Sequence, residues 1–252
     1  MPEPLGRLLG SGNVAEVFAY GSHALKLYRT GTSKASPFRE AANLAVIESL
    51  GISAPRVLEL IEHGGRWGVV MTLAEGEPLG KRMLTQTERI DFIGGLVALQ
   101  RRLHALPAPG LPALKHRLAS RIAAAAELGP TTKTHLLTTL SALPDGDRLC
   151  HGDFHPWNIH GDPETATIVD WLDATAGPPE ADACRSYLLF HQYDPGVARL
   201  YLTAFSAAAG TPEANILDWL PIMAAARLVE LPPEQRPQLL ALMGDNAAQA
   251  AQ

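Results

Sequence analysis

Residues 149–173 read LCHGDFHPWNIHGDPETATIVDWLD, and this stretch decides how the rest of the chain is interpreted. Two short apolar runs, 149–150 and 167–169, are typical of buried strands, and each leads into polar residues that include an aspartate. Turn-forming glycines and prolines between the two runs predict a tight, irregular path. We therefore expect Asp153 and Asn158 on this path, together with Asp170, to face one small volume.

These three side chains have the chemistry that phosphoryl transfer requires. The reaction needs a divalent metal to neutralise phosphate charge and a carboxylate to orient and deprotonate the attacking hydroxyl. Asn158 and Asp170 offer the hard oxygen ligands that magnesium takes beside nucleotide phosphates, which leaves Asp153 as the catalytic base. The alternative is that all three are ordinary turn residues, because Asp, Asn, Gly and Pro are common wherever a chain bends.

The motif HGDFHPWN followed by IVDW resembles the catalytic and metal loops of the aminoglycoside phosphotransferase and choline kinase family, small-molecule kinases related in fold to protein kinases. Against the protein kinase signatures H-R-D-L-x-x-x-N and D-F-G, His151, Asp153 and Asn158 fall in register, and Asp170 takes the place of the metal-binding aspartate. A glycine and a tryptophan replace the arginine and phenylalanine of those signatures, which favours the small-molecule branch. The resemblance also puts His155 where protein kinases carry a lysine that steadies the γ-phosphate.

The resemblance implies an α+β, protein-kinase-like two-lobe fold, with a five-stranded antiparallel sheet in the N-terminal lobe and a mainly helical C-terminal lobe. It assigns residues 1–73 to the nucleotide-binding lobe, 74–78 to a hinge, and 79–252 to the helical lobe with the catalytic loop and the acceptor pocket. Turn signals and alternation predict the strands, and a proline-led pattern predicts one helix at 37–50. The strands are expected at residues 5–10, 14–20, 23–28, 56–62 and 67–73.

A glycine-containing turn and a strand lysine are the candidate phosphate contacts. The turn GSGN contains Gly10, Ser11 and Gly12, and glycines let a backbone approach phosphates closely. Lys26 alternates with two leucines on its strand, so its side chain points to the face opposite theirs. A lysine on that face could reach the α and β phosphates. The alternative is that Lys26 is merely the solvent-facing residue of an alternating strand.

The family resemblance supplies further candidate nucleotide contacts. In these kinases a glutamate on the helix expected at 37–50 pairs with the strand lysine; Glu40, expected in the first turn, is the candidate and Glu48 is the competitor. The run VVMTLAEGEPL resembles the segment that links the lobes, whose backbone groups hydrogen-bond adenine in the family. Its expected contacts are Met71 at the back of the pocket and the backbone of Thr72, Leu73, Ala74 and Glu75.

From Thr85 onward, apolar residues recur every three or four positions, which predicts amphipathic helices. Thr85 is the expected N-cap of the first helix. His104 is assigned to the surface or the packing face of that helix, and Asp182 resembles a structural aspartate of the family that braces the catalytic loop through backbone hydrogen bonds. The helices are expected at 85–106, 112–128, 131–143, 179–192, 195–209, 212–230 and 233–249.

Charge is distributed unevenly along the chain, and this bears on the acceptor. Residues 1–143 carry 16 positive and 11 negative side chains, whereas residues 144–252 carry 5 and 15. An acidic lobe attracts cations, and aromatic faces can hold a quaternary ammonium, so a cationic acceptor is slightly favoured over a merely solvated acidic surface. The candidate acceptor contacts are Asp173, Glu180, Trp157, Glu230, Trp171 and Trp219.

The composition indicates which classes of partner the protein binds and in which cellular compartment it works. A hydrophobic content of 46% and a charged content of 19% are ordinary for a soluble globular protein, and the net charge of -5 argues against a nucleic-acid binder. No apolar run approaches the length that spans a bilayer, and the segment MPEPLGRLLG lacks the pattern of a signal peptide. Two cysteines in apolar contexts fit a reducing compartment. We expect a cytoplasmic monomer or homodimer with no membrane partner.

The sequence thus predicts an ATP-dependent phosphotransferase that uses magnesium, with GTP as the alternative donor. Its γ-phosphoryl group would pass to a hydroxyl of a small molecule, one with aminoglycoside-like, cationic character in the favoured interpretation. The alternatives are a metabolic kinase of an amino alcohol or sugar, and a catalytically silent nucleotide-binding regulator. The presence of Asp153, Asn158 and Asp170 together argues against the silent regulator.

Overall fold

The computed structural model describes residues 4–82, 86–162 and 165–244. The chain divides into two compact units, the first formed by Met1–Arg82 with Pro156–Asp173 and the second by Met83–His155 with Ala174–Gln252. The segment 149–173 is therefore shared, because its first part through His155 belongs to the second unit and the remainder to the first. The lobe boundaries expected from the sequence, with a hinge at 74–78, stay a prediction.

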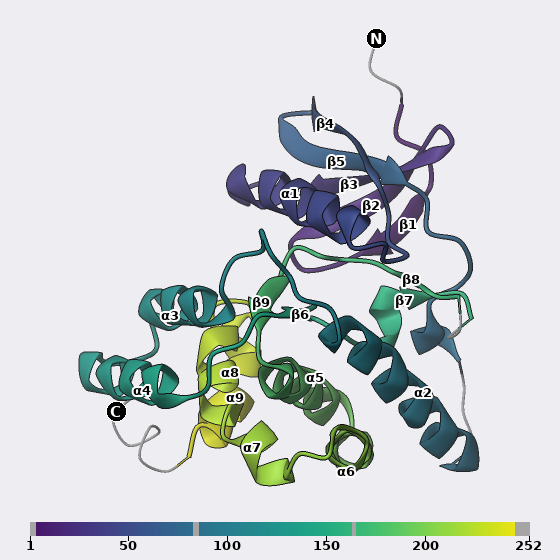
Figure 1. Cartoon of the computed structure of the whole chain (residues 1–252). Coiled ribbons are helices and arrows are strands. Elements are labelled where there is room, and N and C mark those ends of the chain that lie inside the picture. Colours follow the sequence, from purple (N-terminus) through teal and green to yellow (C-terminus); the bar gives the residue numbers. More distant parts are fainter. Residues whose placement is uncertain (1–3, 83–85, 163–164, 245–252) are drawn as a thin grey trace. The chain divides into compact units, whose positions relative to one another are not determined.

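The first unit contains a five-stranded antiparallel sheet with the strand order β1-β2-β3-β5-β4 (Figure 1). This confirms the predicted α+β class with an antiparallel sheet in the N-terminal part. Each strand lies within three residues of its expected bounds, the largest difference being a later start of β1. The strands are β1 (Leu8–Ser11), β2 (Ala15–Tyr20), β3 (His23–Tyr28), β4 (Val57–His63) and β5 (Arg66–Thr72).

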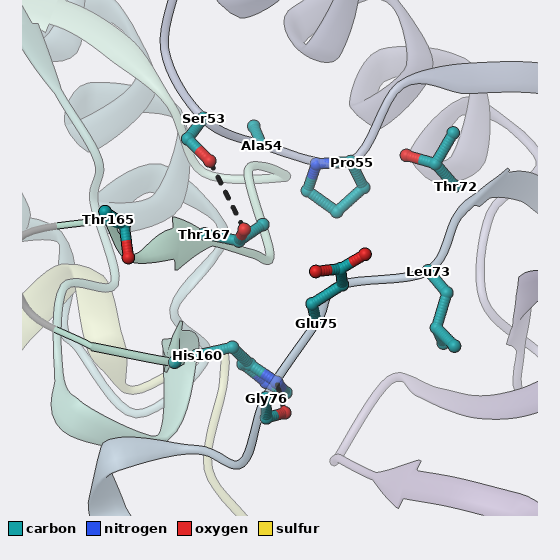
Figure 2. A pocket seen from close by; sticks show the side chains of 11 residues that line it. Ser53, Ala54, Pro55, Thr72, Leu73, Glu75, Gly76, His160, Thr165 and Thr167 are labelled. Atoms are coloured by element: carbon teal, nitrogen blue, oxygen red, sulfur yellow. Dashed lines mark hydrogen bonds between the residues drawn. The ribbon is translucent and has the colours of Figure 1, made fainter.

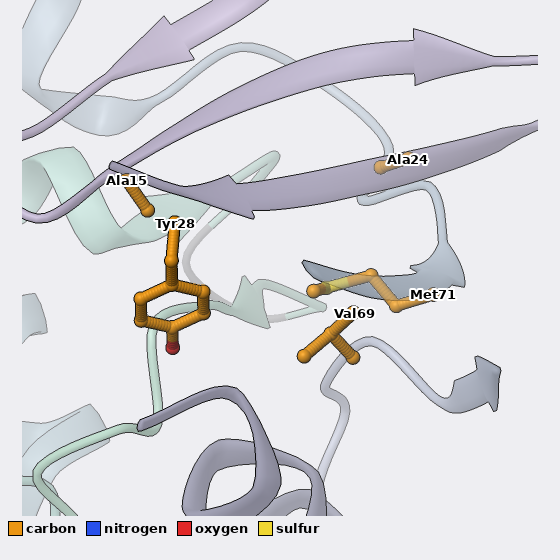
Figure 3. Close-up of a cluster of buried hydrophobic side chains, with 5 residues drawn as sticks. All are labelled: Ala15, Ala24, Tyr28, Val69 and Met71. Carbon is orange, nitrogen blue, oxygen red and sulfur yellow. The ribbon is translucent and has the colours of Figure 1, made fainter. Parts of the chain in front are cut away.

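The two faces of this sheet bury different side chains, because successive residues of a strand point to opposite faces. On β3, Leu25 and Leu27 lie on one face and pack with Val70 of β5. Lys26 points to the other face and is only 6% exposed despite its charge. Figure 3 shows the apolar side chains of that second face: Ala15, Ala24, Tyr28, Val69 and Met71. The sheet thus places a buried cation beside an apolar surface.

Helix α1 (Ala35–Ser49) lies against β4 and β5 (Figure 1). It begins two residues before the expected start, because Pro37 is tolerated in a first turn, where backbone N–H groups have no partner within the helix. Glu40 therefore lies in the second turn rather than the first. The buried stripe of α1 has the spacing i, i+3, i+4, i+7 and includes two polar residues: Glu40, Asn43, Leu44 and Ile47.

Short elements complete the first unit. They are η1 (Leu79–Lys81), η2 (Pro156–Asn158), β7 (Ile159–His160) and β8 (Thr167–Ile168). Strands β7 and β8 form an antiparallel hairpin. A Cβ atom on Gly80 would lie 2.5 Å from the ring of Trp157, so only glycine fits where η1 meets that ring.

The second unit is mainly helical, as predicted. Helix α5 is contacted by α6, α7, α8 and β6, and β6 pairs with β9 in a two-stranded sheet. The elements are α2 (Gln86–His104), α3 (Leu114–Ala124), α4 (Pro130–Ala142), β6 (Arg148–Cys150), β9 (Thr175–Gly177), α5 (Pro179–Tyr193), α6 (Pro195–Ala209), α7 (Glu213–Leu217), α8 (Leu220–Arg227), η3 (Pro233–Gln235) and α9 (Arg236–Leu242). Thr85, the expected N-cap, lies outside the described residues.

Two expected helices are wrong in their extent. The helix expected at 212–230 is two helices, α7 and α8, because Pro221 lacks a backbone N–H and is accommodated in the first turn of α8. The helix expected at 233–249 is η3 followed by α9, with Pro237 in the first turn of α9 for the same reason. Residues 245–249 of that expected helix lie outside the described residues. No helix in the described part of the chain is long and apolar enough to cross a bilayer.

Candidate active site

Lys26 is the centre of a buried ion cluster in the first unit. Its Nζ donates to Oε1 of Glu40 and to Oδ1 of Asp170, each at 2.7 Å, and the hydroxyl of Tyr28 donates to the other oxygen of Glu40. Glu48, the competing glutamate, has no such bond. The cluster joins Lys26 of β3, Glu40 of α1 and Asp170, which lies two residues after the end of β8. Sequence analysis placed Lys26 and Asp170 in one site, and the structure brings their side chains into direct contact.

The charges of this cluster depend on one another. Burial alone would lower the pKa of Lys26, but the adjacent charges of Asp170 and Glu40 outweigh it and raise that pKa. Burial raises the pKa of Glu40, and Lys26 opposes that change. Both oxygens of Glu40 accept hydrogen bonds, one of them from the charged Lys26, and the ionised carboxylate satisfies both donors without a proton of its own, so we assign an ion pair. Burial and the charge of Glu40 raise the pKa of Tyr28, which remains a donor.

The backbone at Asp170 is held in an uncommon conformation. Its φ is 64°, the one positive value for a non-glycine residue among the described residues, and such a conformation persists only where the surroundings hold it. Asn43 Nδ2 donates to the carbonyls of Trp171 at 2.8 Å and Leu172 at 3.2 Å, and Trp171 Nε1 donates to Ile168 O at 2.8 Å. Helix α1 therefore anchors the segment that carries Asp170.

Asn158 and Asp170, the expected metal ligands, lie at the same end of the β7–β8 hairpin. Asn158 directly precedes β7, Ile159 pairs with Ile168, and Val169 N donates to the backbone oxygen of Asn158 at 2.9 Å. A side-chain amide oxygen and a carboxylate fit magnesium, which prefers hard oxygen ligands. In the described ranges no group of three or more His, Cys, Asp and Glu side chains could hold a metal. Magnesium at nucleotide sites usually keeps waters and binds phosphate oxygens beside one or two protein ligands, and a site of this size suits that pattern.

Asp153, the expected base, lies in the second unit, and each of its carboxylate oxygens has a charged or polar neighbour. Oδ2 is 3.2 Å from Nε2 of His155, and Nη2 of Arg185 donates to Oδ1 at 3.2 Å. Burial would raise the pKa of Asp153, but the hydrogen bond from His155 and the charge of Arg185 hold it well below its ordinary value. Asp153 is therefore ionised at neutral pH, and its side chain is 26% exposed.

One face of α5 holds the backbone of the loop that contains Asp153. Gly152 N donates to Oδ1 of Asp182 at 2.7 Å, Arg185 Nε donates to Gly152 O at 3.0 Å, and Ser186 Oγ donates to Phe154 O at 2.9 Å. The residues of α5 involved have the spacing i, i+3, i+4, which puts them on one helix face. The backbone bond expected for Asp182 is present.

Asp182 is in turn held by a buried polar network from α2. Gln100 Nε2 donates to Oδ2 of Asp182 at 2.9 Å, and Nε2 of His104 lies 2.9 Å from the same oxygen. Burial would raise the pKa of Asp182, but the bonds from His104, Gln100 and Gly152 N outweigh it and lower that pKa. His104 is thus a buried residue and not a surface histidine. It also does more than pack, because it hydrogen-bonds to Asp182, which holds the loop that contains Asp153.

The candidate phosphate turn is a tight connection between β1 and β2. Gly12 N donates to Ala15 O at 2.9 Å, which closes the turn. Arg29, at the end of β3, donates from Nη2 to Ser11 Oγ at 2.8 Å and from Nε to Gly12 O at 3.1 Å. Ser11 and Gly12 are exposed, and the turn follows β1, which is an edge strand of the sheet that carries Lys26.

The candidate adenine segment follows β5. Met71 is buried on the apolar face of Figure 3, and Thr72 Oγ1 accepts from Arg56 N at 2.9 Å. Thr72 and Leu73 also line a cavity of about 590 Å³ within the first unit (Figure 2). That cavity is lined by Ser53, Ala54, Pro55, Thr72, Leu73, Glu75, Gly76, His160, Gly161, Thr165 and Thr167. Ala74, the next residue along the chain after Leu73, is half-buried.

The expected acceptor contacts do not share one environment. Trp171 and Trp219 are 0% and 1% exposed, so both are core residues and their assignment to an acceptor pocket is wrong. Trp157 is half-exposed and lies against Gly80. Glu230 forms ion pairs with three arginines. Asp173 and Glu180 are half-buried, in the first and second units respectively.

Sequence analysis missed two residues that hold the site. Asn43 follows Glu40 by three positions, so helical periodicity alone places both on one face of α1 and could have identified it. Arg185 follows Asp182 by three positions and could have been found in the same way.

Comparisons with known proteins identify the family of the chain and structures of similar fold. The sequence model of the phosphotransferase enzyme family matches residues 7–217. The fold is similar to a crystal structure of aminoglycoside-3'-phosphotransferase of type VIII, with 20% identity, a TM-score of 0.63, and 88% of this chain and 89% of that chain covered.

Two further solved structures share the fold. A ternary complex of a thermostable mutant of aminoglycoside phosphotransferase APH(4)-Ia with ADP and hygromycin B has 14% identity and a TM-score of 0.69, covering 98% of this chain and 94% of that chain. APH(3'')-Id from Streptomyces rimosus has 20% identity and a TM-score of 0.60, covering 86% and 92%. No curated protein matches the sequence.

Proposed function

This chain belongs to the phosphotransferase enzyme family, and we propose that it transfers the γ-phosphoryl group of ATP to a hydroxyl of a small molecule. It is a kinase with an alcohol group as acceptor. The observation that best supports the proposed donor is the bridging of Glu40 and Asp170 by Lys26 in a buried position. A fixed, charged lysine beside an apolar face and an aspartate suits a nucleotide whose phosphates need a cation.

The first unit binds the donor in this proposal. Lys26 contacts the α and β phosphates, Gly10, Ser11 and Gly12 approach them with backbone, and Met71 to Ala74 receive the adenine. Asn158 and Asp170 would hold magnesium, which when bound neutralises charge on the phosphates. Glu40 fixes Lys26, and Asn43 fixes the backbone at Asp170.

Asp153 acts on the acceptor. Its carboxylate accepts the acceptor's hydroxyl proton while that oxygen bonds to the γ-phosphorus and the bond from phosphorus to the bridging oxygen breaks, which releases ADP. Asp153 and Asn158 are five residues apart, so the chain keeps their Cα atoms within about 18 Å of each other. Because the pKa of Asp153 is lowered, its ionisation sets no acidic limit on the rate near neutral pH.

The acceptor is proposed to be a polyhydroxyl compound. Solved structures of this fold were obtained with hygromycin B and with streptomycin, which supports that class but does not select the compound. A metabolic kinase of an amino alcohol or sugar is the second candidate. We further propose a cytoplasmic location, since Cys150 and Cys184 are free and buried and fit a reducing compartment.

The test is a panel of acceptors with coupled detection of ADP. It should contain hygromycin B, streptomycin, choline, ethanolamine and simple sugars, each assayed with ATP and magnesium, with Asp153→Asn as the matched control. We expect at least one acceptor to raise ADP release by the wild type well above the rate with water alone, and not to do so for the variant. If ATP and magnesium raise the melting temperature but no acceptor raises ADP release, the chain is a silent nucleotide-binding regulator.

Asn43→Leu is expected to raise the magnesium concentration for half-maximal turnover about fivefold, because the hydrogen bonds it loses are worth about 1 kcal/mol. Leucine has the same branching at Cγ but cannot donate to the carbonyls of Trp171 and Leu172. ATP affinity without magnesium should not change. Asn215→Leu, on the exposed side of α7, is the matched control. An unchanged magnesium midpoint in a folded Asn43→Leu protein would show that this anchor does not serve Asp170.

A further inference from the structure

One carboxylate in the second unit receives three guanidinium groups. Glu230, which follows α8, accepts from Nη1 of Arg121 at 2.5 Å, Nη2 of Arg185 at 2.6 Å and Nη1 of Arg227 at 2.9 Å. The arginines come from α3, α5 and α8, and the side chain of Arg185 is 6% exposed while that of Glu230 is 19% exposed. Such a concentration of charge is unusual in a largely buried place, because desolvating each ion is costly.

Arg185 connects this cluster to the base. Its Nη2 donates to Glu230 and also to Oδ1 of Asp153, while its Nε donates to the carbonyl of Gly152. A single planar guanidinium thus contacts the side chain of Asp153, the backbone just before it, and a fixed anion. Because the five N–H groups of arginine are held in one plane, fixing two of these contacts fixes the direction of the third.

We propose that Arg185, anchored by Glu230, is a positioning residue that sets the orientation of the Asp153 carboxylate; this rests on the proposed function of Asp153 as the base. A carboxylate turns about its terminal bond with little preference, so its direction depends on its partners. Here His155 contacts Oδ2 and Arg185 contacts Oδ1. Glu230 keeps Arg185 in place, and Arg121 and Arg227 keep Glu230 in place.

This assignment differs from the sequence-based expectation, in which Glu230 is one of several candidate acceptor contacts. To bind a cationic acceptor, Glu230 would need a negative charge that is not already paired. Its charge is neutralised by the guanidinium groups of three arginines. The excess of positive charge is visible at Arg227, where burial and the nearby charge of Arg185 lower the pKa to about 10. We therefore assign Glu230 as the ion-pair partner of the three arginines and not as a contact for a cationic acceptor.

The test measures the pKa of Asp153 directly. The full chain is labelled with carbon-13 at the aspartate carboxyl groups and titrated by NMR. The signal of Asp153 is assigned by its loss in Asp153→Asn. Asp153 faces His151 and His155 on its own loop, Arg185 on α5, and the charge of Arg227 on α8. In Glu230→Gln one negative charge is lost, so a purely electrostatic effect would lower the pKa of Asp153 or leave it unchanged. If Arg185 needs its anchor, that pKa rises instead, because Arg185 leaves Oδ1.

We expect the pKa of Asp153 to rise in both Glu230→Gln and Arg185→Lys. In Arg227→Met, which leaves Glu230 with two arginines and removes a nearby positive charge that is not among the hydrogen-bond partners of Asp153 described above, the pKa should rise by less than in either of these variants. Affinity for ATP with magnesium should remain within about twofold in all three. A lowered or unchanged pKa in folded Glu230→Gln would overturn the proposal. This readout needs no turnover, so a wild type that transfers no phosphoryl group would refute the proposed function without deciding the role of Arg185.

Once an acceptor is known from the panel, kinetics supply a second readout. Arg185→Lys should lower kcat about 10²-fold with little change in the KM for ATP, the size expected when a reacting group is misplaced by about 1 Å. Equal effects on kcat and on the KM for ATP would indicate general damage to the fold and contradict a positioning role.

Discussion

Asp153→Asn is expected to lower kcat about 10³-fold, within the range of about 10²–10⁴ for the loss of a general base. The amide has the same shape and can still accept a hydrogen bond, but it cannot take the proton of the acceptor hydroxyl. Arg185 keeps its bonds to Gly152 O and Glu230, so the loop should stay in place. Rapid-quench measurement of labelled phosphate on the acceptor would give the rate.

Binding separates this effect from damage to the nucleotide site. Calorimetry should give an affinity for ATP with magnesium within about twofold of wild type, because in the proposed function Asp153 contacts the acceptor and not the donor. Asp147→Asn, an aspartate in the same part of the chain whose side chain is 79% exposed, should match wild type in both assays. If Asp153→Asn kept most of its activity, another group would have to be the base.

Lys26→Met should have the second-largest effect, and it should act on both binding and stability. The KM for ATP should rise and kcat/KM should fall about 10²-fold or more, as expected when a charged contact to phosphates worth about 3 kcal/mol is lost. Removing one partner of a buried pair also leaves Glu40 uncompensated, which should lower the free energy of unfolding at pH 7 by about 3 kcal/mol. Urea denaturation and steady-state kinetics measure the two effects separately.

The stability loss of Lys26→Met should depend on pH in a definite direction. Without Lys26, burial raises the folded-state pKa of Glu40 above its unfolded value of about 4.3, so folding takes up a proton. The variant should therefore approach wild-type stability below pH 4.3 and lose stability as the pH rises through the folded-state pKa. Lys26→Met combined with Glu40→Gln should recover stability at pH 7 but not ATP binding. A pH-independent loss would contradict the ion-pair assignment.

The first unit was largely predictable from local pattern. Alternation on β3 places Lys26 opposite Leu25 and Leu27, and turn residues mark the strand ends, so strand bounds differ little from those expected. The extent of the last helices was not predicted correctly. Apolar residues keep helical spacing across Pro221, and this spacing predicted one continuous helix although a proline lies inside it. A proline inside a periodic run can end one helix and begin the next.

The candidate site was predictable where one short segment carries it. Asp153, Asn158 and Asp170 come from one motif, and Asp182 from the family resemblance. Helical periodicity could have placed Arg185 on the same face as Asp182, but no local pattern reports its bond to Glu230, 45 residues further along. Trp171 was misassigned because an aromatic residue beside an aspartate has the same sequence signature in a pocket and in a core.

In the proposed function Asn158 and Asp170 hold the divalent ion that accompanies the nucleotide, and the other roles depend on this site. Electron paramagnetic resonance of manganese, titrated into the protein with the analogue AMP-PNP, tests it most directly, because it counts bound ions without needing an acceptor. We predict tight binding by the wild type and by Asp153→Asn, and affinity at least about tenfold weaker in Asp170→Asn and Asn158→Leu, as for the loss of about 1.4 kcal/mol. Manganese binding by folded Asp170→Asn equal to that of the wild type would contradict it.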